Sequence, residues 1–446
     1  MKKRLDLRWA VTLALGTLGC AAGQATAAGF ALYEQNASGL GNSYAGASAA
    51  AEDASTVFWN PAGMAKLRPG KHMALVGHSI NPTTKFSNGA SAAGLNRTDF
   101  GGDGGNAGNA ALIPNGYFAM DLNPRWNFGV GINVPFGLAT EYDPNWVGRF
   151  QGIKSEIQTL NINPSLSWKA NDQLSLGFGV SYQQGEIDLL TGVNYKGIVF
   201  GTALNPLVAA NAEGQNKISL EGSGWGYNLG LIYDLTPSTR LGFAYRSRVK
   251  QDLSGTVSFS GVPAAYGLSP ALTAATANGG VKLTVKTPDS AAFSLVHKLS
   301  GNWDLLGEIT WTGWSVVNSL PLVRDSGTTL DTLRFNFRDT MRYAGGARYK
   351  MNDSWTLKMG LALDETPVPN SNDRSVRLPD SDRTWFTFGV KYKLSNAASI
   401  DAGFAHIRGK DAPIANNQNV GNVRGNVNGN YTTTVNILSV QYSRAF

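Results

Sequence analysis

Cysteine is almost absent from this chain, and charge is scarce. Cys20 is the only cysteine among 446 residues, and charged residues make up 15%. A single thiol excludes a disulfide framework within the chain and a metal site built from several cysteines. We expect neither a metal nor another cofactor; the alternative is a calcium ion held by the carboxylates and glycines of residues 99–109, which we interpret as a flexible outer loop.

Motifs of enzyme active sites are missing as well. The four histidines, His72, His78, His297 and His406, are scattered, and neither an H-E-x-x-H pair nor a G-x-S-x-G elbow occurs. A serine and a histidine brought together from different strands would escape such a search. We nevertheless expect no enzyme activity.

Long apolar runs are confined to the start of the chain. Four basic residues precede an apolar run at 9–22, and Ala25-Thr26-Ala27 is a cleavage pattern. The run is too short to span a bilayer, so we interpret residues 1–27 as a secretory signal peptide. The alternative is lipidation of Cys20, whose upstream sequence resembles a lipoprotein box but has Thr17 where that box has leucine.

The charge that remains is nearly balanced. Removing the four basic residues and the one acidic residue of the leader lowers the net charge from +7 to +4, which gives no argument for nucleic-acid binding. Glycine is abundant, at 53 residues, and aromatic residues reach 10%. An exported, glycine-rich and aromatic-rich chain without membrane helices is typical of a transmembrane β-barrel or a large secreted β-protein.

A short pattern recurs along the chain: a polar turn, a bulky residue, and then alternating apolar and small polar residues. In one instance Leu174, Leu176 and Phe178 lie on one face, and Ser175 and Gly177 lie on the other. Aromatic residues at both ends of the apolar face favour strands that cross two lipid interfaces. The pattern predicts six tight hairpins, at 123–134, 171–182, 236–247, 301–311, 352–363 and 395–406.

We predict an all-β fold: a transmembrane antiparallel barrel of fourteen strands (residues 71–446) preceded by an N-terminal plug (residues 28–70). Single-chain bacterial barrels have an even number of strands, and tight turns face the periplasm. The terminal Phe446 is the usual signal for the barrel assembly machinery, which we expect as a partner. The predicted strands are 72–86, 112–122, 125–136, 156–169, 173–187, 218–235, 239–251, 281–299, 302–314, 335–350, 354–364, 382–394, 397–407 and 431–446.

Two of the long connections are apolar instead of polar. Segments 197–211 and 261–279 contain helix-like stretches broken by Pro206, Pro263 and Pro270. Exposed apolar patches often mark binding surfaces, and these connections face the outside medium. Alternatively, the two segments pack on each other as caps.

Residues 28–70 are dense in alanine, glycine and serine and show little periodicity. A barrel of fourteen strands would otherwise hold a wide aqueous lumen, so we expect this segment to fill it. Within it, Phe58 and Trp59 are suited to wedge against the wall, Asn60 to satisfy a turn, and Pro61 to stop regular structure.

The segment 28–64 resembles the N-terminal hatch of the FadL family of outer-membrane transporters for long-chain fatty acids, including the motif Asn60, Pro61 and Ala62. The resemblance implies a hatched barrel of fourteen strands. Outer loops would capture hydrophobic substrates, an inner site would bind them, and a kink in the third strand would release them sideways. Some members of the family carry aromatic hydrocarbons instead. Further segments similar to the family lie at 136–152 and 365–385.

Carried over to this chain, the resemblance places Phe30 near the inner site. The third strand contains Gly129, Gly131 and Pro135, which are compatible with a break in the ladder. Alternatively, the glycines only make room for the hatch. The resemblance assigns gating to Asn60, Pro61 and Ala62, and we place Phe58 and Trp59, the predicted wedges, at the same hatch site.

Strand alternation directs several basic side chains into the lumen. Arg246, Arg248 and Lys391, together with Lys358 and Lys393, would offer partners to a carboxylate substrate. The alternative is that they pair with acids of the plug or wall. The acids in question are Glu52, Asp53 and Glu308.

We therefore expect an uptake channel for long-chain fatty acids or similar hydrophobic molecules, in the outer membrane of a Gram-negative bacterium and in contact with lipopolysaccharide. An aromatic hydrocarbon channel of the same family is the first alternative. A general porin would need an open lumen and polar outer loops, and a structural or adhesin-type barrel would not need apolar outer clefts.

Overall fold

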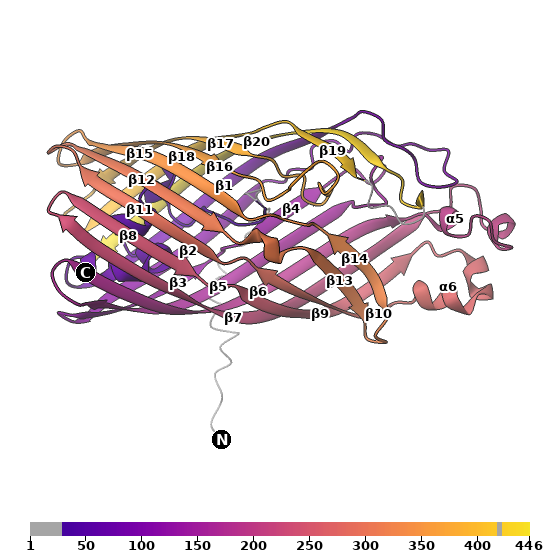
Figure 1. Cartoon of the computed structure of the whole chain (residues 1–446), viewed down its shortest axis with the longest axis horizontal. Helices are drawn as coiled ribbons and strands as arrows, with labels where there is room; N and C mark the ends of the chain where they lie inside the picture. Colours follow the sequence, from indigo (N-terminus) through magenta and orange to yellow (C-terminus); the bar gives the residue numbers. More distant parts are fainter. Residues whose placement is uncertain (1–28, 417–421) are drawn as a thin grey trace, which may run out of the picture.

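The computed structural model describes residues 29–416 and 422–446. The predicted signal peptide, the lipoprotein-like box and Ala28 lie outside these residues. Twenty strand segments form one antiparallel sheet, which closes because β1 (Lys71–Asn88) pairs with both β2 (Ala111–Asn123) and β20 (Val427–Ala445). Figure 1 shows the resulting barrel from the side.

The twenty segments make fourteen strands, because six strands are interrupted, and the predicted fourteen-stranded antiparallel barrel is confirmed. The other uninterrupted strands are β5 (Lys154–Lys169), β6 (Leu174–Val193), β7 (Gly214–Thr236), β16 (Trp355–Asp364) and β17 (Arg383–Lys393). The interrupted strands are β3 with β4 (Trp126–Asn133, Gly137–Glu141), β8 with β9 (Thr239–Arg246, Val249–Ser260), β10 with β11 (Gly279–Thr287, Ser290–Lys298), β12 with β13 (Trp303–Thr312, Ser319–Arg324), β14 with β15 (Thr329–Arg334, Thr340–Lys350) and β18 with β19 (Ala398–Gly409, Ala412–Asn416).

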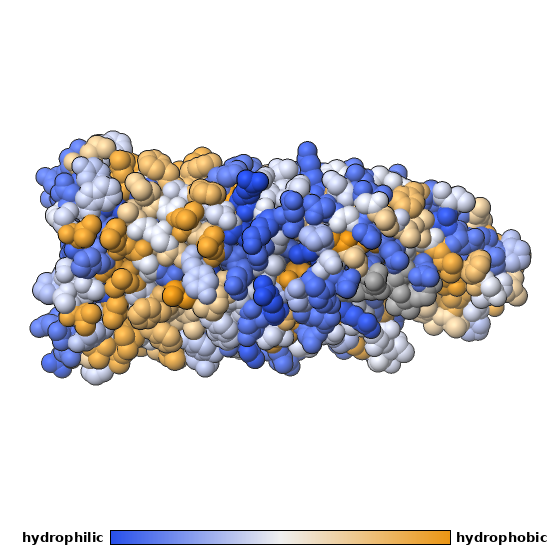
Figure 2. Space-filling model, turned by 45° about the horizontal axis from the view of Figure 1, so that its top comes forward, coloured by the Kyte–Doolittle hydropathy of each residue, from blue (hydrophilic) through white to orange (hydrophobic). Residues whose placement is uncertain are grey.

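The wall directs apolar side chains outward and small polar side chains inward. In β11 and β12, Phe293, Leu295 and Ile309 are exposed, whereas Ser294 and Thr310 are buried. A water-soluble protein would keep such an exposed face polar, so the apolar band is where lipid surrounds the barrel. Figure 2 shows this band over the left half of the molecule, bordered by a polar belt.

The six predicted tight turns lie together at one end of the barrel, on the left in Figure 1, with the C-terminus. The Phe446 N–H donates to the Lys71 carbonyl at 2.8 Å, so the wall begins and ends there. We call this the inner end, because short turns of outer-membrane barrels face the periplasm. The long connections form the outer end.

Four short helices stand in two outer connections: α5 (Tyr195–Ile198) and η2 (Asn205–Leu207) in one, η3 (Ala264–Leu268) and α6 (Pro270–Ala275) in the other. The sequence predicted that Pro206 and Pro270 break helices. In the structure each of them instead lies in the first turn of a helix. The missing N–H of proline is not needed there, since the first N–H groups of a helix have no partner within it. No helix among the described residues is long and apolar enough to cross a membrane.

Residues 29–70, here called the N-terminal segment, lie inside the ring of strands and are mostly buried. They contact inward-facing parts of β17 and β18 on one side and of β6, β7, β8 and β11 on the other. Their helices are α2 (Ala37–Leu40), α3 (Ala47–Ala50), α4 (Thr56–Trp59) and η1 (Pro61–Lys66).

The lining of the lumen changes along the barrel axis. Around the N-terminal segment the inward side chains are small and polar, such as Asn163, Ser165 and Ser181. Nearer the outer end, where Gln251 and Thr287 are polar exceptions, a cluster of apolar side chains from several strands forms most of the lining. These residues are Ile187, Leu189, Ile218, Leu220, Leu253, Val257, Val281, Leu283 and Val285.

Candidate functional site

The turn at Asn60 fastens the N-terminal segment to the wall. Asn60 is fully buried, and its Nδ2 donates to the Ser48 carbonyl at 2.6 Å and to the Leu231 carbonyl of β7 at 3.0 Å. Its Oδ1 accepts the Ala62 N–H at 3.1 Å, which caps η1, and Pro61 occupies the first position of η1. The amide side chain thus serves both as a helix cap and as a wall anchor.

Glycines in the wall provide the seat for this turn. A Cβ atom on Gly177 of β6 would collide with the backbone of Pro61 and Ala62, and one on Gly230 of β7 would collide with the Asn60 side chain. Glycine is needed here because the two backbones approach more closely than any side chain would permit.

Gly129 of β3 packs closely against the N-terminal segment. A Cβ atom on Gly129 would lie 2.5 Å from Met64 Sδ and 2.6 Å from Val57 Cγ2. β3 is paired on both sides at Gly129 and Gly131, so the ladder does not break there. Of the two interpretations of Gly129, making room for the N-terminal segment fits the structure.

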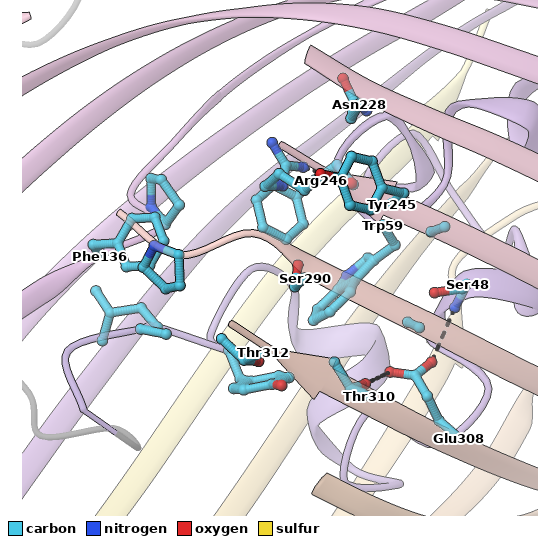
Figure 3. A pocket seen from close by; sticks show the side chains of 18 of the residues that line it. Ser48, Trp59, Phe136, Asn228, Tyr245, Arg246, Ser290, Glu308, Thr310 and Thr312 are labelled. Atoms are coloured by element: carbon cyan, nitrogen blue, oxygen red, sulfur yellow. Dashed lines mark hydrogen bonds between the residues drawn. The ribbon is translucent and has the colours of Figure 1, made fainter. Parts of the chain in front are cut away.

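A cavity of about 760 Å³, including space open to solvent, lies between the N-terminal segment and the wall strands β7, β8, β11 and β12. We call it the inner cavity. Phe58, Trp59, Pro135 and Phe136 give it an apolar side. Figure 3 shows polar groups of the wall on its other side, among them Arg246.

Arg246 is the single cation among the described residues that line the inner cavity. Its Nη2 donates to the Phe58 carbonyl at 2.8 Å, and its Cζ lies 4.1 Å from the centre of the Phe58 ring. It forms no ion pair with an acid among the described residues. An arginine in such a place offers charged N–H groups to an anion that enters the cavity.

Glu308 is the single acid among the described lining residues, and its oxygens are already occupied. The Ser48 N–H donates to its Oε2 at 3.1 Å, and the hydroxyl groups of Ser294 and Thr310 also donate to its carboxylate. The expectation that Glu308 pairs with a lumen base is therefore wrong. Its partners are close hydroxyl and amide donors, which satisfy the carboxylate and tie α3 to the wall.

A second cavity, of about 680 Å³ including open space, lies nearer the outer end; most of its lining residues are apolar, and Glu186 and Arg377 are the charged ones. Phe30 lines this outer cavity, whereas Phe136 lines the inner one. Their ring centres lie 5.7 Å apart, and both rings contact Trp314 of η4 (Trp314–Val316), at 4.8 Å from Phe30 and 6.4 Å from Phe136. These three rings form an aromatic partition between the two cavities.

The wall has a gap beside this partition. β2 pairs with β3 only from Gly116 onward, and β4 pairs with β5 but not with β2. The free edge of the third strand is covered from within, because Leu32 N–H donates to the Pro135 carbonyl at 2.9 Å and Gly137 N–H donates to the Phe30 carbonyl at 2.8 Å. Residues 30–32 thus close the gap as a short added strand.

Arg248 does not lie on the lumen side, contrary to the sequence prediction. The interruption between β8 and β9 shifts the alternation by one residue, so Ser247 is buried and the Arg248 side chain is 50% exposed. Arg248 Nε instead pairs with Asp289 at 2.8 Å, at the matching interruption between β10 and β11.

Lys391 lies away from both cavities, in a buried charge cluster around Glu52 at the end of α3. Its Nζ is 3.9 Å from Glu52 and 3.7 Å from Asp401, and Lys358 is 3.0 Å from Glu52. Burial alone would raise the pKa of Glu52, but the positive charges of Arg348, Lys358 and Lys391 outweigh it and hold the pKa well below its usual range. Lys358 and Lys391 therefore pair with Glu52, an acid of the N-terminal segment, which is the alternative that the sequence left open for these bases.

Sequence reasoning did not identify Phe136 and Trp314 as site residues. Pro135 is a signal for Phe136, because proline ends strand pairing and turns the next side chain. Trp314 carries no such signal: it ends a stretch predicted as continuous strand, and only the turn of η4 directs its ring into the lumen.

A closed barrel of fourteen strands with an apolar outer band defines a class, the transmembrane β-barrel; this one holds its own N-terminal segment and two cavities in its lumen. The chain belongs to the outer membrane protein transport protein family (OMPP1/FadL/TodX), whose family model matches residues 18–446. It is an outer-membrane protein.

Three relatives illustrate the similarity. The chain is 32% identical over 406 residues to a protein of Escherichia coli O6:H1 named long-chain fatty acid transport protein, with 87% of this chain and 88% of the relative covered. The crystal structure of a FadL homologue from Pseudomonas aeruginosa matches with a TM-score of 0.87 and 28% identity over 94% of this chain and 100% of that chain. The toluene transporter TbuX of Ralstonia pickettii matches with a TM-score of 0.66 and 21% identity over 93% and 100% of the two chains, and shows the fold alone.

Proposed function

We propose that this protein takes up long-chain fatty acids across the outer membrane, with Arg246 as the ligand of the substrate carboxylate. The observation that carries the proposal is a cation in the inner cavity without an ion-pair partner among the described residues. Leaving a charge in such a place is unfavourable unless an anion joins it for part of the cycle.

The rest of the route favours the same substrate class. Hydrocarbon side chains line the outer lumen and the outer cavity, which suits an alkyl chain, and Arg246 lies beyond the partition, where a carboxylate head would arrive. The name of the relative in Escherichia coli is consistent with this substrate. An aromatic hydrocarbon, the alternative, would leave Arg246 without a partner.

The N-terminal segment acts in this proposal as a hatch that blocks the lumen toward the periplasm. The Asn60, Pro61 and Ala62 turn holds it against β7, and the Glu52 cluster holds it against the opposite wall. The substrate therefore leaves through the gap between β2 and β4 once residues 30–32 detach. Contacts with lipopolysaccharide around the apolar band and insertion by the barrel assembly machinery belong to the same proposal.

The experiment that tests this substrate is labelled uptake by a strain that lacks the gene, complemented with the wild-type chain. We expect uptake of oleate to be restored and uptake of toluene to stay at the level of the empty vector. Restoration with toluene alone would overturn the fatty-acid assignment. Leakage of small polar solutes without uptake of either would favour a general porin.

A further inference from the structure

The outer end of the molecule carries two segments without any charged residue. Residues 197–212 and 261–278 contain no aspartate, glutamate, lysine or arginine. Charged residues make up about a quarter of ordinary globular chains, and loops in water usually hold more than their share. Two such segments at the aqueous end of an outer-membrane protein indicate that this end binds an apolar partner.

The two segments pack on each other and still leave an apolar surface. Tyr195 and Tyr266 are buried between them, with ring centres 5.3 Å apart, and the Tyr266 hydroxyl donates to the Tyr195 carbonyl at 2.9 Å. On the outer side Phe200 is 53%, Leu207 60% and Leu268 68% exposed. The packing alternative left open by the sequence is therefore what the structure has, and an apolar surface remains exposed beside it. We call the exposed set the tip: Ile198, Phe200, Leu207, Val262 and Leu268.

The tip is separate from the lipid-facing band of the barrel. Figure 2 shows a second apolar region at the right end of the molecule, beyond the polar belt, and Figure 1 places α5 and α6 at that end. The bilayer around the band therefore does not cover the tip. One strand links the tip to the outer lumen: Val193, the last residue of β6, packs against the buried loop cluster, and Leu189 of the same strand belongs to the apolar lining.

We propose that the tip docks on the surface of lipid aggregates, such as oil droplets that contain fatty acid, and that substrate enters from there; the second half rests on the proposed function. Long-chain fatty acids have little solubility as monomers, so most of the supply in water is aggregated. Exposed aromatic and leucine side chains partition into such an interface. The absence of charge means that no ion has to lose its water on insertion.

Flotation with triolein droplets tests the docking itself. The full-length protein in nanodiscs is mixed with the droplets and centrifuged, and the floated fraction is measured. The wild type should float, and a variant with Phe200→Ser, Leu207→Ser and Leu268→Ser should bind at least about tenfold more weakly, because three apolar contacts are lost. Phe100→Ser is the matched control, since Phe100 is 40% exposed but lies outside the two segments, and it should float like the wild type. Equal flotation of the triple variant would overturn the docking.

Uptake from two supplies separates docking from capture of single molecules. Cells with the triple variant receive oleate either dissolved in triolein droplets or buffered by albumin as monomer. We expect uptake from droplets to fall and uptake from albumin to stay unchanged. An equal fall with both supplies would overturn the proposal and make the tip a site for monomers. A wild type that floats but takes up no oleate would instead contradict the proposed function, while the docking would stand.

Discussion

At the scale of single residues, Arg246 decides between a carboxylate and an uncharged substrate. Its guanidinium is held by the Phe58 carbonyl and ring, which leaves other N–H groups for a ligand. Hydrogen bonds to a charged group contribute about 1.5–3 kcal/mol. We expect Arg246→Gln to weaken oleate binding roughly ten- to hundredfold, measured by competition with a fluorescent fatty acid.

The control for this substitution uses both another ligand and another arginine. Oleyl alcohol has the same chain without the charge and should bind equally to the wild type and to Arg246→Gln. Arg248→Gln should leave oleate binding unchanged, because Arg248 is half exposed and paired with Asp289. Equal losses for oleate and oleyl alcohol would show that Arg246 only supports the shape of the cavity.

Glu34 makes the packing of the N-terminal segment depend on pH. Burial raises its pKa to about 7, although Arg383 and Arg342 favour the charged form and Asp364 opposes it. Between about pH 4.5 and pH 7, Glu34 is protonated in the folded segment but ionised in the unfolded segment. The free energy of unfolding of the segment therefore falls as pH rises through this window, by on the order of 3 kcal/mol. We expect hydrogen exchange of residues 30–36, corrected for intrinsic rates, to be faster at pH 8 than at pH 5.

Glu34→Gln removes the titrating group and should abolish this difference. The amide keeps the size of the side chain, so the fold of the segment is not put at risk. If the variant showed the same pH dependence as the wild type, another group would be responsible.

At the scale of elements, the wall strands and the N-terminal segment fit only where glycine stands between them. We expect Gly177→Ala to lift η1 from β6, because the added Cβ would collide with Pro61 and Ala62. Liposome swelling should then report faster entry of small sugars than with the wild type. Gly307→Ala is the matched control, since no atom lies within 4 Å of the added Cβ, and it should not leak. If Gly177→Ala admitted small sugars no faster than the wild type, the close packing of η1 against β6 would be contradicted.

The hairpins could be predicted from the sequence, whereas the interruptions could not. A tight turn and an alternating strand are local patterns, and all six turns and the strand number follow from them. The break at Pro288 divides a stretch that alternation predicts as one strand, and the break at Ser247 moves Arg248 to the outer face. Where a strand stops pairing depends on contacts with distant residues, and alternation carries no information about these.

The same limit applies to the candidate site. Resemblance to the family pointed to the Asn60 turn, and alternation placed Arg246 in the lumen, where the structure has it. The aromatic partition joins Phe30, Phe136 and Trp314, which are far apart in the sequence and meet only in the closed barrel. No local pattern marks such a meeting.

At the scale of the whole molecule, one short stretch closes two openings. Residues 30–32 cover the gap in the wall through their backbone, and Phe30 closes the passage between the cavities through its ring. Detachment of this stretch would therefore open the partition and the wall together. A hydrophobic molecule could then pass from the outer cavity to the membrane without crossing water, which is the central claim of this account.

A reversible cross-link between Ala31 and Phe136 tests this claim most directly. The two residues face each other as an antiparallel bridge, a spacing that suits a disulfide, and the only native cysteine, Cys20, lies in the predicted leader. In the double variant Ala31→Cys and Phe136→Cys, we expect oxidation to stop oleate uptake, while oleate binding persists and a reductant restores uptake. If the oxidised variant transported oleate as fast as the reduced one, the substrate would leave by another way and the account would be contradicted.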